Sequence, residues 1–407
     1  MPSSRRCLAS SRAPQSLAGA RDPYNPDMTS FRILILGGYG LFGGRIVAAL
    51  ANDPALILIV AGRSPERAAE FVSGLRETQA SIEVATLDTT FATFNMRLAE
   101  LRPDLVIDTA GPFQSRDYRV AEAALAIGAH CIDLADSRAY VSGIGALDAA
   151  ARTANRRVVS GASSVPGLNA AVVASLHSRF AKLESVESAI SPGNRTARGW
   201  ATMLAILGCV GKPYPVLHDG RHEVAYGWQS LRRIRIANVG TRWLANCEVP
   251  DLDVLPARYP ELKTVEFRAG LELWRMHFGL WLGSLAVRFG PVRSLLPFAR
   301  PLFVLSERWQ GFGSDVGVMQ VVLRGRDHED KPLALTWTLI ARDGDGPQIP
   351  ATAAVLLARK LARGELAGGG ASACIDLFTL DEFMQELAGY VIQASLEEQS
   401  DLPQQAH

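Results

Sequence analysis

Apolar runs and helix-like patterns alternate between residues 31 and 160. Short apolar or alternating segments, typical of strands, cover residues 31–36, 56–61, 82–87, 105–108, 130–134 and 157–160. The segments between them predict helices over residues 45–51, 66–77, 94–101, 120–127 and 145–154. Repeated strand–helix–strand spacing predicts an α/β domain over residues 31–160, with a doubly wound parallel sheet of the Rossmann type.

The pattern changes after Gly161, where the predicted strands become longer and alternate more clearly. They cover residues 186–191, 233–237, 264–269, 318–326 and 333–342, and the last two flank a polar turn, RDHEDK. We expect a second, mixed α+β domain over residues 161–345, which would bind substrate or form a dimer. A helix predicted at 350–365 begins a C-terminal region, residues 346–390, that we expect to return to the first domain.

Both ends of the chain lack a structural pattern. Residues 1–30 contain no apolar stretch long enough for a secretory signal. We expect them to be disordered, or absent from the protein if translation begins at Met28, directly before the first strand. The polar residues 391–407 are also expected to be disordered.

The segment 271–306 is unusually apolar for a soluble domain. Its longest uncharged stretch, Met276–Val287, has twelve residues, whereas crossing a bilayer takes about 20. Three interpretations remain open at this point: an interfacial membrane segment, a subunit interface that would make a homodimer, or a cap over an apolar pocket.

A glycine-rich loop, GGYGLFG, directly follows the first predicted strand and opens the first predicted helix. It places Gly38, Gly40 and Gly43 in the order G-x-G-x-x-G. Glycines in this context allow a tight turn and close approach of the backbone to a pyrophosphate. We therefore predict a dinucleotide site at Gly38–Gly43, with Tyr39, Leu41 and Phe42 between its glycines.

Residues at the carboxyl ends of the next three predicted strands indicate further contacts to the cofactor. Arg63 and Ser64 follow the second strand, where an NAD-selective site usually has an acid, so NADP(H) is the predicted cofactor. Asp88 either accepts from the adenine amino group or caps a helix at residues 89–91. The nicotinamide ribose is expected near Ala110, Gly111 and Pro112, at the end of the fourth strand.

Hydride transfer also needs a polar group where charge develops on the substrate. Polar residues near the carboxyl ends of the later strands are candidates, whereas Asp133 is expected to be structural. Our candidate catalytic residues are Asp117, Tyr118, Asp136 and Arg195, with Arg138, Ser163 and Ser164 as further possibilities.

Composition excludes several partners. Basic and acidic residues number 42 and 41, giving a net charge of +1, which does not favour nucleic-acid binding. The five cysteines form no C-x-x-C pair and the seven histidines are scattered, so we expect neither a disulfide framework nor a metal site. A reducing, cytoplasmic location follows from this cysteine usage.

Five segments together resemble the saccharopine dehydrogenase superfamily. They are GGYGLFG at 37–43, VAGR at 60–63, DTAGPF at 108–113, IDLAD at 132–136 and SSVPGLNAAV at 163–172. The resemblance implies a Rossmann domain, an inserted mixed domain, and a pocket between them. It also implies a pyridine-nucleotide site at Gly38, Gly40, Gly43 and Arg63, and a substrate carboxylate at Arg195.

The resemblance is incomplete at the segment that begins with Ser164. Pro166 and Gly167 match the family, but Ser164 replaces an acid and Asn169-Ala170 replaces an Asp-His pair. We therefore expect an NADP(H)-dependent oxidoreductase that acts on a C=N, C=O or activated C=C bond of a fairly apolar small molecule other than saccharopine. The alternatives are a non-catalytic NADP(H) sensor or scaffold and a membrane-surface protein that uses residues 271–306.

Overall fold

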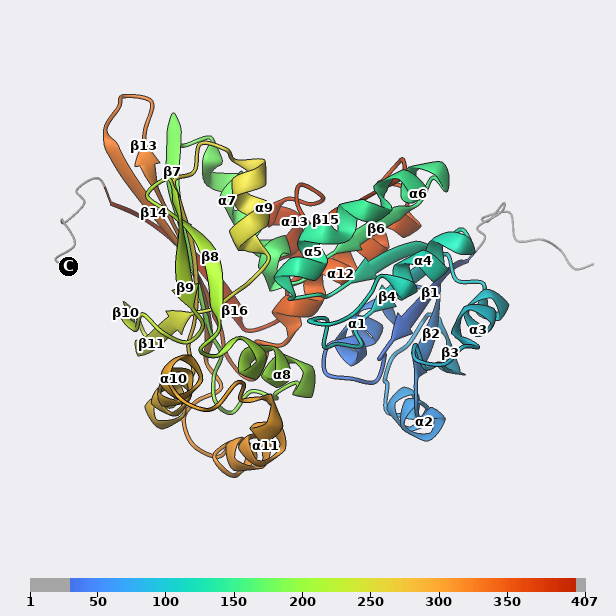
Figure 1. Cartoon of the computed structure of the whole chain (residues 1–407). Coiled ribbons are helices and arrows are strands. Elements are labelled where there is room, and N and C mark those ends of the chain that lie inside the picture. The colour runs from blue at the N-terminus through green and yellow to red at the C-terminus, as the bar shows by residue number, and fades with distance from the viewer. Residues whose placement is uncertain (1–29, 400–407) are drawn as a thin grey trace, which may run out of the picture. The chain divides into compact units, whose positions relative to one another are not determined.

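A computed structural model describes residues 30–399 of the chain. Its first sheet has seven parallel strands in the order β15-β6-β5-β4-β1-β2-β3 (Figure 1). The strands are β1 (Phe31–Leu36), β2 (Leu56–Gly62), β3 (Ser81–Thr86), β4 (Leu105–Asp108), β5 (His130–Asp133), β6 (Arg157–Ser160) and β15 (Gly370–Ala373). This is the predicted Rossmann-type sheet, with one strand more than the sequence indicated.

Alternate residues of the central strands explain why helices cover both faces of this sheet. Ile33 and Ile35 of β1 pack in one buried cluster, whereas Leu34 and Leu36 pack in another. The first cluster includes residues of α1 (Gly43–Leu50), α2 (Pro65–Ser73) and α12 (Gln348–Ala362). The second includes residues of α3 (Phe94–Leu101), α4 (Arg119–Ala126), η1 (Ile144–Leu147) and α6 (Asp148–Thr153). The apolar run over residues 33–36 of β1 therefore reflects burial on both faces.

The second sheet has nine strands and is mixed. Its main path is β10-β11-β12-β7-β13-β14-β16, with β8 and β9 attached beside β12, and β12 and β7 pair in parallel. The strands are β7 (Lys182–Ser191), β8 (Pro213–His218), β9 (Arg221–Tyr226), β10 (Arg232–Ile236), β11 (Gly240–Asn246), β12 (Thr264–Ala269), β13 (Gly317–Arg326), β14 (Pro332–Ala341) and β16 (Ile392–Gln399). The predicted mixed second domain is thus present, and β13 and β14 form the hairpin expected around RDHEDK.

The prediction of a disordered tail from residue 391 is wrong for residues 392–399. These residues form β16, which pairs antiparallel with β14 along its whole length. A strand at the sheet edge exposes most of its side chains, so its polar composition does not prevent main-chain pairing. The disorder expected for residues 1–29 and 400–407 falls outside the described residues.

The C-terminal region reaches the first sheet, where α12 packs on α1 and β15 extends the sheet beyond β6. One buried cluster continues from α1 and α12 through the helices that adjoin them to the inner face of the second sheet. These helices are α7 (Asn169–His177), α9 (Asp251–Arg258) and α13 (Leu380–Glu386), and η2 (Ser164–Leu168) leads into α7. A further short helix, α5 (Arg138–Gly143), contacts α9.

The apolar segment 271–306 forms two helices beside the second sheet. They are α10 (Trp274–Phe289) and α11 (Ala299–Arg308), joined through the short η3 (Leu296–Phe298). Figure 1 shows them together with α8 (Trp200–Cys209), which contacts α11. Among residues 30–399, no helix is long and apolar enough to cross a membrane.

Candidate functional site

The glycine loop between β1 and α1 is shaped by close backbone contacts. Gly37 has a φ of +75°, which favours glycine, and its amide donates to the Ala61 carbonyl of β2 at 2.8 Å. A Cβ placed on Gly43 would lie 2.2 Å from the Gly37 oxygen. The first turn of α1 can therefore approach β1 only if residue 43 has no side chain.

The loop also presents unused hydrogen-bond donors. Within residues 30–399, the backbone amides of Leu41 and Phe42 donate to no acceptor. They lie at the N-terminus of α1, where amides and the helix dipole favour an anion. The loop thus fits a dinucleotide pyrophosphate, which Gly38–Gly43 would hold.

Arg63 and Ser64 directly follow β2 at the surface of the first domain. Arg63 is exposed, while the Ser64 hydroxyl caps α2 by accepting from the Arg67 amide at 3.3 Å. The Ser64 amide donates to the Tyr39 hydroxyl at 2.9 Å, which fixes the Tyr39 ring against the end of β2. Within residues 30–399 Arg63 forms no hydrogen bond or ion pair, and it follows β2, where a ribose 2′-phosphate would be recognised.

Asp88 follows β3 and forms a local turn. Its Oδ1 accepts from the amide of Thr90 at 2.9 Å and from the Thr90 hydroxyl at 2.7 Å. These bonds lower the pKa of Asp88, and the nearby Arg63 lowers it further. Residues 89–91 form a turn rather than the predicted helix, so Asp88 closes a turn instead of capping a helix, and the adenine contact stays a prediction.

The loop after β4 carries Ala110, Gly111 and Pro112. Asp108 lies buried at its base, accepts from the Ala110 amide at 2.9 Å, and pairs with Arg116 at 3.0 Å. A Cβ on Gly111 would meet the Ala201 side chain of α8 at 3.1 Å. Hydrogen bonds and an ion pair thus hold this loop in place, directly against α8.

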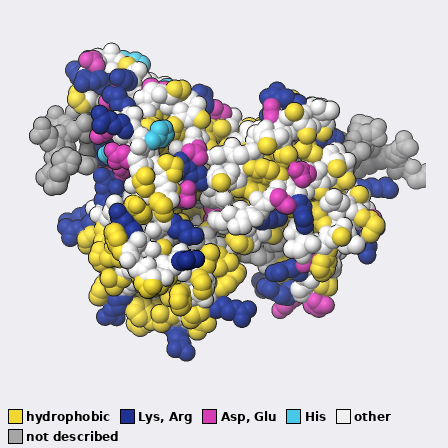
Figure 2. Space-filling view, in the orientation of Figure 1, with side chains coloured by type: hydrophobic (Ala, Val, Ile, Leu, Met, Phe, Trp, Pro, Cys, Tyr) yellow, Lys and Arg dark blue, Asp and Glu magenta, His cyan; other side chains and the backbone are white. Residues whose placement is uncertain are grey.

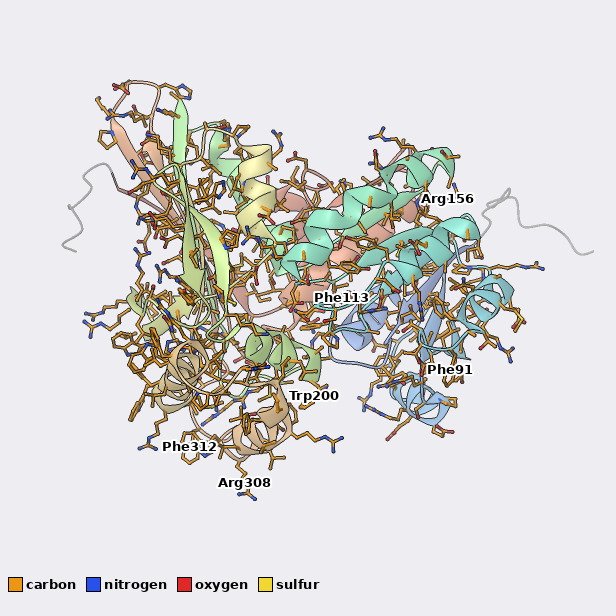
Figure 3. The ribbon with its side chains drawn as sticks, in the orientation of Figure 1. Phe91, Phe113, Arg156, Trp200, Arg308 and Phe312 are labelled. Atoms are coloured by element: carbon orange, nitrogen blue, oxygen red, sulfur yellow. The ribbon has the colours of Figure 1, made fainter. Side chains whose placement is uncertain are left out.

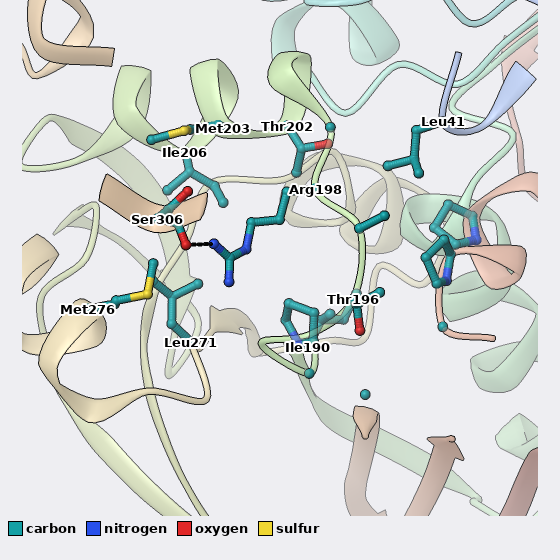
Figure 4. Close-up of a pocket in the computed structure, with 18 of the residues that line it drawn as sticks. Leu41, Ile190, Thr196, Arg198, Thr202, Met203, Ile206, Leu271, Met276 and Ser306 are labelled. Carbon is teal, nitrogen blue, oxygen red and sulfur yellow. Dashed lines mark hydrogen bonds between the residues drawn. The ribbon is translucent and has the colours of Figure 1, made fainter. Parts of the chain in front are cut away.

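A cavity of about 850 Å³ adjoins the glycine loop. Leu41 and Phe42 line one end of it, while α8, α10 and α11 line much of the remainder with apolar side chains. Figure 4 shows part of this lining, including Met203 and Ile206 from α8 and Met276 from α10. A largely apolar cavity of this size can enclose a drug-sized organic molecule.

Few polar groups face this cavity, and three of them follow the strands β5 and β6. They are Asp136, Ser163 and Ser164. Oδ1 of Asp136 accepts from the Gln114 amide nitrogen at 3.0 Å. Burial raises the pKa of Asp136, because an apolar environment disfavours the ionised carboxylate. Asp136 therefore favours the protonated form more than an exposed aspartate does, and it lines the cavity.

Arg198 is a lining residue that sequence reasoning missed. Its guanidinium donates to the Ser306 carbonyl at 2.8 Å (Figure 4) and also to the Asn194 carbonyl, at 2.7 Å. Burial lowers the pKa of Arg198, with Glu307 opposing the shift. The sequence predicts that Arg195, in the same loop, is a catalytic residue. In the structure Arg195 is exposed and does not line the cavity. No local motif distinguishes the two arginines.

Several other sequence candidates lie away from the cavity. The Asp117 side chain is 71% exposed, and the Tyr118 hydroxyl donates to the Tyr140 carbonyl at 2.8 Å. Arg138 pairs with Asp253 and so ties α5 to α9. None of these residues lines the cavity, and we no longer place them at the site.

Asp133 has the structural position that the sequence suggested. It is buried at the end of β5, and its Oδ1 accepts from Ser160, Gly161 and Ala135. Burial raises its pKa to about 7 despite these bonds. Within residues 30–399, no cluster of side chains suits a metal ion.

Together, the sheet, the glycine loop and the adjoining cavity define an NAD(P)-binding, dehydrogenase-like protein. Residues 33–159 match the family model described as the saccharopine dehydrogenase NADP-binding domain. The resemblance stated from the sequence motifs is thereby confirmed.

Solved structures extend the likeness to both sheets. Apo saccharopine dehydrogenase (L-Glu forming) from Saccharomyces cerevisiae aligns with a TM-score of 0.64 at 14% identity, covering 90% of this chain and all (100%) of the other. At this identity the match shows the fold alone. An amine dehydrogenase from Mycobacterium smegmatis has a TM-score of 0.45 at 12% identity, covering 87% and 96% of the two chains, which is too low to establish a shared fold. No curated protein sequence matches the chain.

Proposed function

We propose that this protein is an NADP(H)-dependent oxidoreductase that transfers a hydride to or from a C=N, C=O or activated C=C bond of an apolar molecule. One observation carries the proposal: the cavity is lined both by the glycine-loop residues Leu41 and Phe42 and by the apolar side chains of α8, α10 and α11. A substrate in this cavity would lie beside the cofactor site. When bound, NADP(H) supplies or accepts the hydride.

The chain's own residues would have three tasks. The apolar helices exclude water and orient the substrate. Asp136, held by Gln114, would give a proton to the heteroatom or carbon that becomes electron-rich in the reduction, and take it back in the oxidation. Arg198 offers a positive charge farther along the cavity, suited to a carbonyl or carboxylate group of the substrate.

We expect Arg63→Ala to weaken NADPH binding by about 10- to 100-fold, because a charge-assisted pair with phosphate contributes about 1.5–3 kcal/mol. NADH binding should change little, since NADH carries no 2′-phosphate. Titrations followed by nicotinamide fluorescence would measure both dissociation constants. Arg97→Ala, which removes an exposed arginine from α3, is the matched control. Equal NADPH and NADH affinities in the unmodified protein would contradict the role assigned to Arg63.

Filling the cavity should separate substrate binding from cofactor binding. Gly279 of α10 lines the cavity, and nothing lies within 4 Å of a Cβ placed there. Gly279→Phe should lower kcat/KM for long apolar substrates by about tenfold or more while NADPH affinity is kept. The measurement is NADPH oxidation over a panel of aldehydes, ketones, imines and enones of graded chain length.

The matched control is Gly208→Phe, because Gly208 of α8 also has free space at its Cβ position but does not line the cavity. Equal losses in the two variants would argue against the cavity as the substrate site. NADPH binding without oxidation by any member of the panel would instead favour a non-catalytic, cofactor-sensing protein.

A further inference from the structure

The helix α10 exposes large apolar side chains on one face, while two of its polar side chains are buried. His277 and Ser284 are fully buried, whereas the apolar Trp274, Leu282 and Phe289 are 60%, 59% and 72% exposed. These three exposed residues recur at intervals of eight and seven positions, so they share one face of the helix. Leu280 and Trp281 of the same helix pack inward against a buried cluster, so α10 carries large apolar side chains on its inner face and also on the exposed face of Trp274, Leu282 and Phe289.

The apolar exposure continues through η3 and α11. Leu296, Phe298, Val304, Leu305 and Phe312 are between 40% and 64% exposed. We call these residues, with Trp274, Leu282 and Phe289, the α10–α11 surface. Figure 2 shows hydrophobic side chains gathered over these helices, and Figure 3 shows Phe312 and Arg308 at the end of α11. A continuous exposed apolar surface of this kind marks an interaction site.

The charges around this surface are almost all positive. Residues 274–312 contain five arginines (Arg275, Arg288, Arg293, Arg300 and Arg308) and a single acid, Glu307. The next acid, Glu272, is committed to the protein interior, where it accepts from the Asn194 and Ser314 amides and pairs with Arg242. The surface therefore combines apolar side chains with a positive rim.

The cavity opens toward the same surface. Phe298 and Leu305 both line the cavity, yet each is 49% exposed. These two residues thus belong both to the cavity lining and to the α10–α11 surface. A molecule that enters beside Phe298 and Leu305 would pass from the apolar outer surface into the apolar cavity.

We propose that the α10–α11 surface docks on a bilayer that contains anionic phospholipids, and that the substrate is a lipophilic molecule that enters the cavity from that bilayer. Apolar side chains at the acyl boundary and arginines at the headgroups are what interfacial binding requires. The substrate part rests on the function proposed above, whereas the docking part does not.

A second copy of the chain is a poorer occupant of this surface. A twofold interface brings the same patch of both copies together, so a surface rimmed by exposed arginines in one copy would meet the same positively charged surface in the other. Like charges opposed in this way disfavour association. Anionic headgroups instead complement the rim.

Vesicle flotation of the full chain tests the docking. We expect the protein to float with vesicles of equal parts phosphatidylcholine and phosphatidylglycerol, and less with phosphatidylcholine alone. The double variant Leu282→Glu/Val304→Glu should reduce binding by at least about tenfold, because charged side chains oppose insertion. Arg300→Ala should weaken binding to the anionic vesicles alone, by about fivefold.

The control variants carry the same change at equally exposed apolar positions elsewhere. Phe91 and Val224 are each 64% exposed and lie before α3 and on β9, so Phe91→Glu and Val224→Glu should keep full vesicle binding. Figure 3 marks Phe91 for comparison with Phe312. Unfolding midpoints close to that of the unmodified protein would show that all four glutamate substitutions leave the fold intact.

Two results would overturn the docking proposal. One is failure to float with either vesicle. The other is a dimer, seen by sedimentation, that Leu282→Glu/Val304→Glu dissociates while flotation is unaffected. The substrate part has its own readout: this double variant should lose turnover of a long-chain carbonyl compound dissolved in vesicles but keep that of a short-chain, water-soluble one. Equal loss on both substrates would contradict entry from the bilayer, whereas flotation without any turnover would refute only the enzymatic function.

Discussion

Gly43→Ala should weaken NADPH binding by roughly a hundredfold, since losing two amide–phosphate hydrogen bonds of about 1.5 kcal/mol each has this effect. The added Cβ would lie 2.2 Å from the Gly37 oxygen and 2.8 Å from Oγ1 of Thr109. Neither neighbour can withdraw easily, because Gly37 is bonded to β2 and the Thr109 hydroxyl donates to the Leu36 carbonyl at 2.7 Å. The first turn of α1, with its amides, must therefore move away.

The matched control is Gly145→Ala. Gly145 lies in η1 of the same domain, and no atom lies within 4 Å of a Cβ placed there. It should bind NADPH like the unmodified protein. Calorimetric titration gives both affinities, and thermal unfolding without cofactor shows whether Gly43→Ala is still folded. A folded Gly43→Ala protein with unchanged NADPH affinity would rule out the loop as the phosphate site.

The parallel sheet could be predicted because its strands and turns carry local signals. Residues 33–36 of β1 are all apolar because both faces of the strand are buried there, and the glycine loop marks the start of α1. The strands β15 and β16 escaped prediction for a common reason. Gly370–Ala373 consists of small residues and Ile392–Gln399 is mostly polar, so tertiary main-chain pairing rather than a side-chain pattern defines them.

The candidate site also has a part with a local sequence signal and a part without one. The residues of the glycine loop are contiguous, so sequence alone could group them. The cavity instead joins Leu41, Asp136, Arg198 and Met276, which are far apart in the chain and meet only through packing. Three positions separate Arg195 from Arg198, and only the path of the loop decides which guanidinium faces the cavity.

Asp136→Asn should lower the rate of hydride transfer by about 10²- to 10⁴-fold, which is the usual contribution of a general acid or base. Asparagine keeps the size of the side chain but cannot exchange a proton. NADPH affinity should stay the same, because Asp136 lies at the cavity and not on the glycine loop. Rapid-mixing measurements of NADPH oxidation, with the first active member of the carbonyl, imine and enone panel, would give the rate.

The pH profile distinguishes this role from a structural one. Since burial raises the pKa of Asp136, its carboxyl stays protonated to a higher pH than an exposed aspartate. Reduction should therefore proceed below this raised pKa and fall as the pH increases through it, and oxidation should show the opposite dependence. In Asp136→Asn this fall in the rate of reduction with rising pH should disappear. Asp117→Asn, at an exposed position outside the cavity, should retain both the rate and the pH profile. If Asp136→Asn kept the same pH-dependent limb at a reduced rate, the proton would have to come from another group, and Asp136 would only position the substrate.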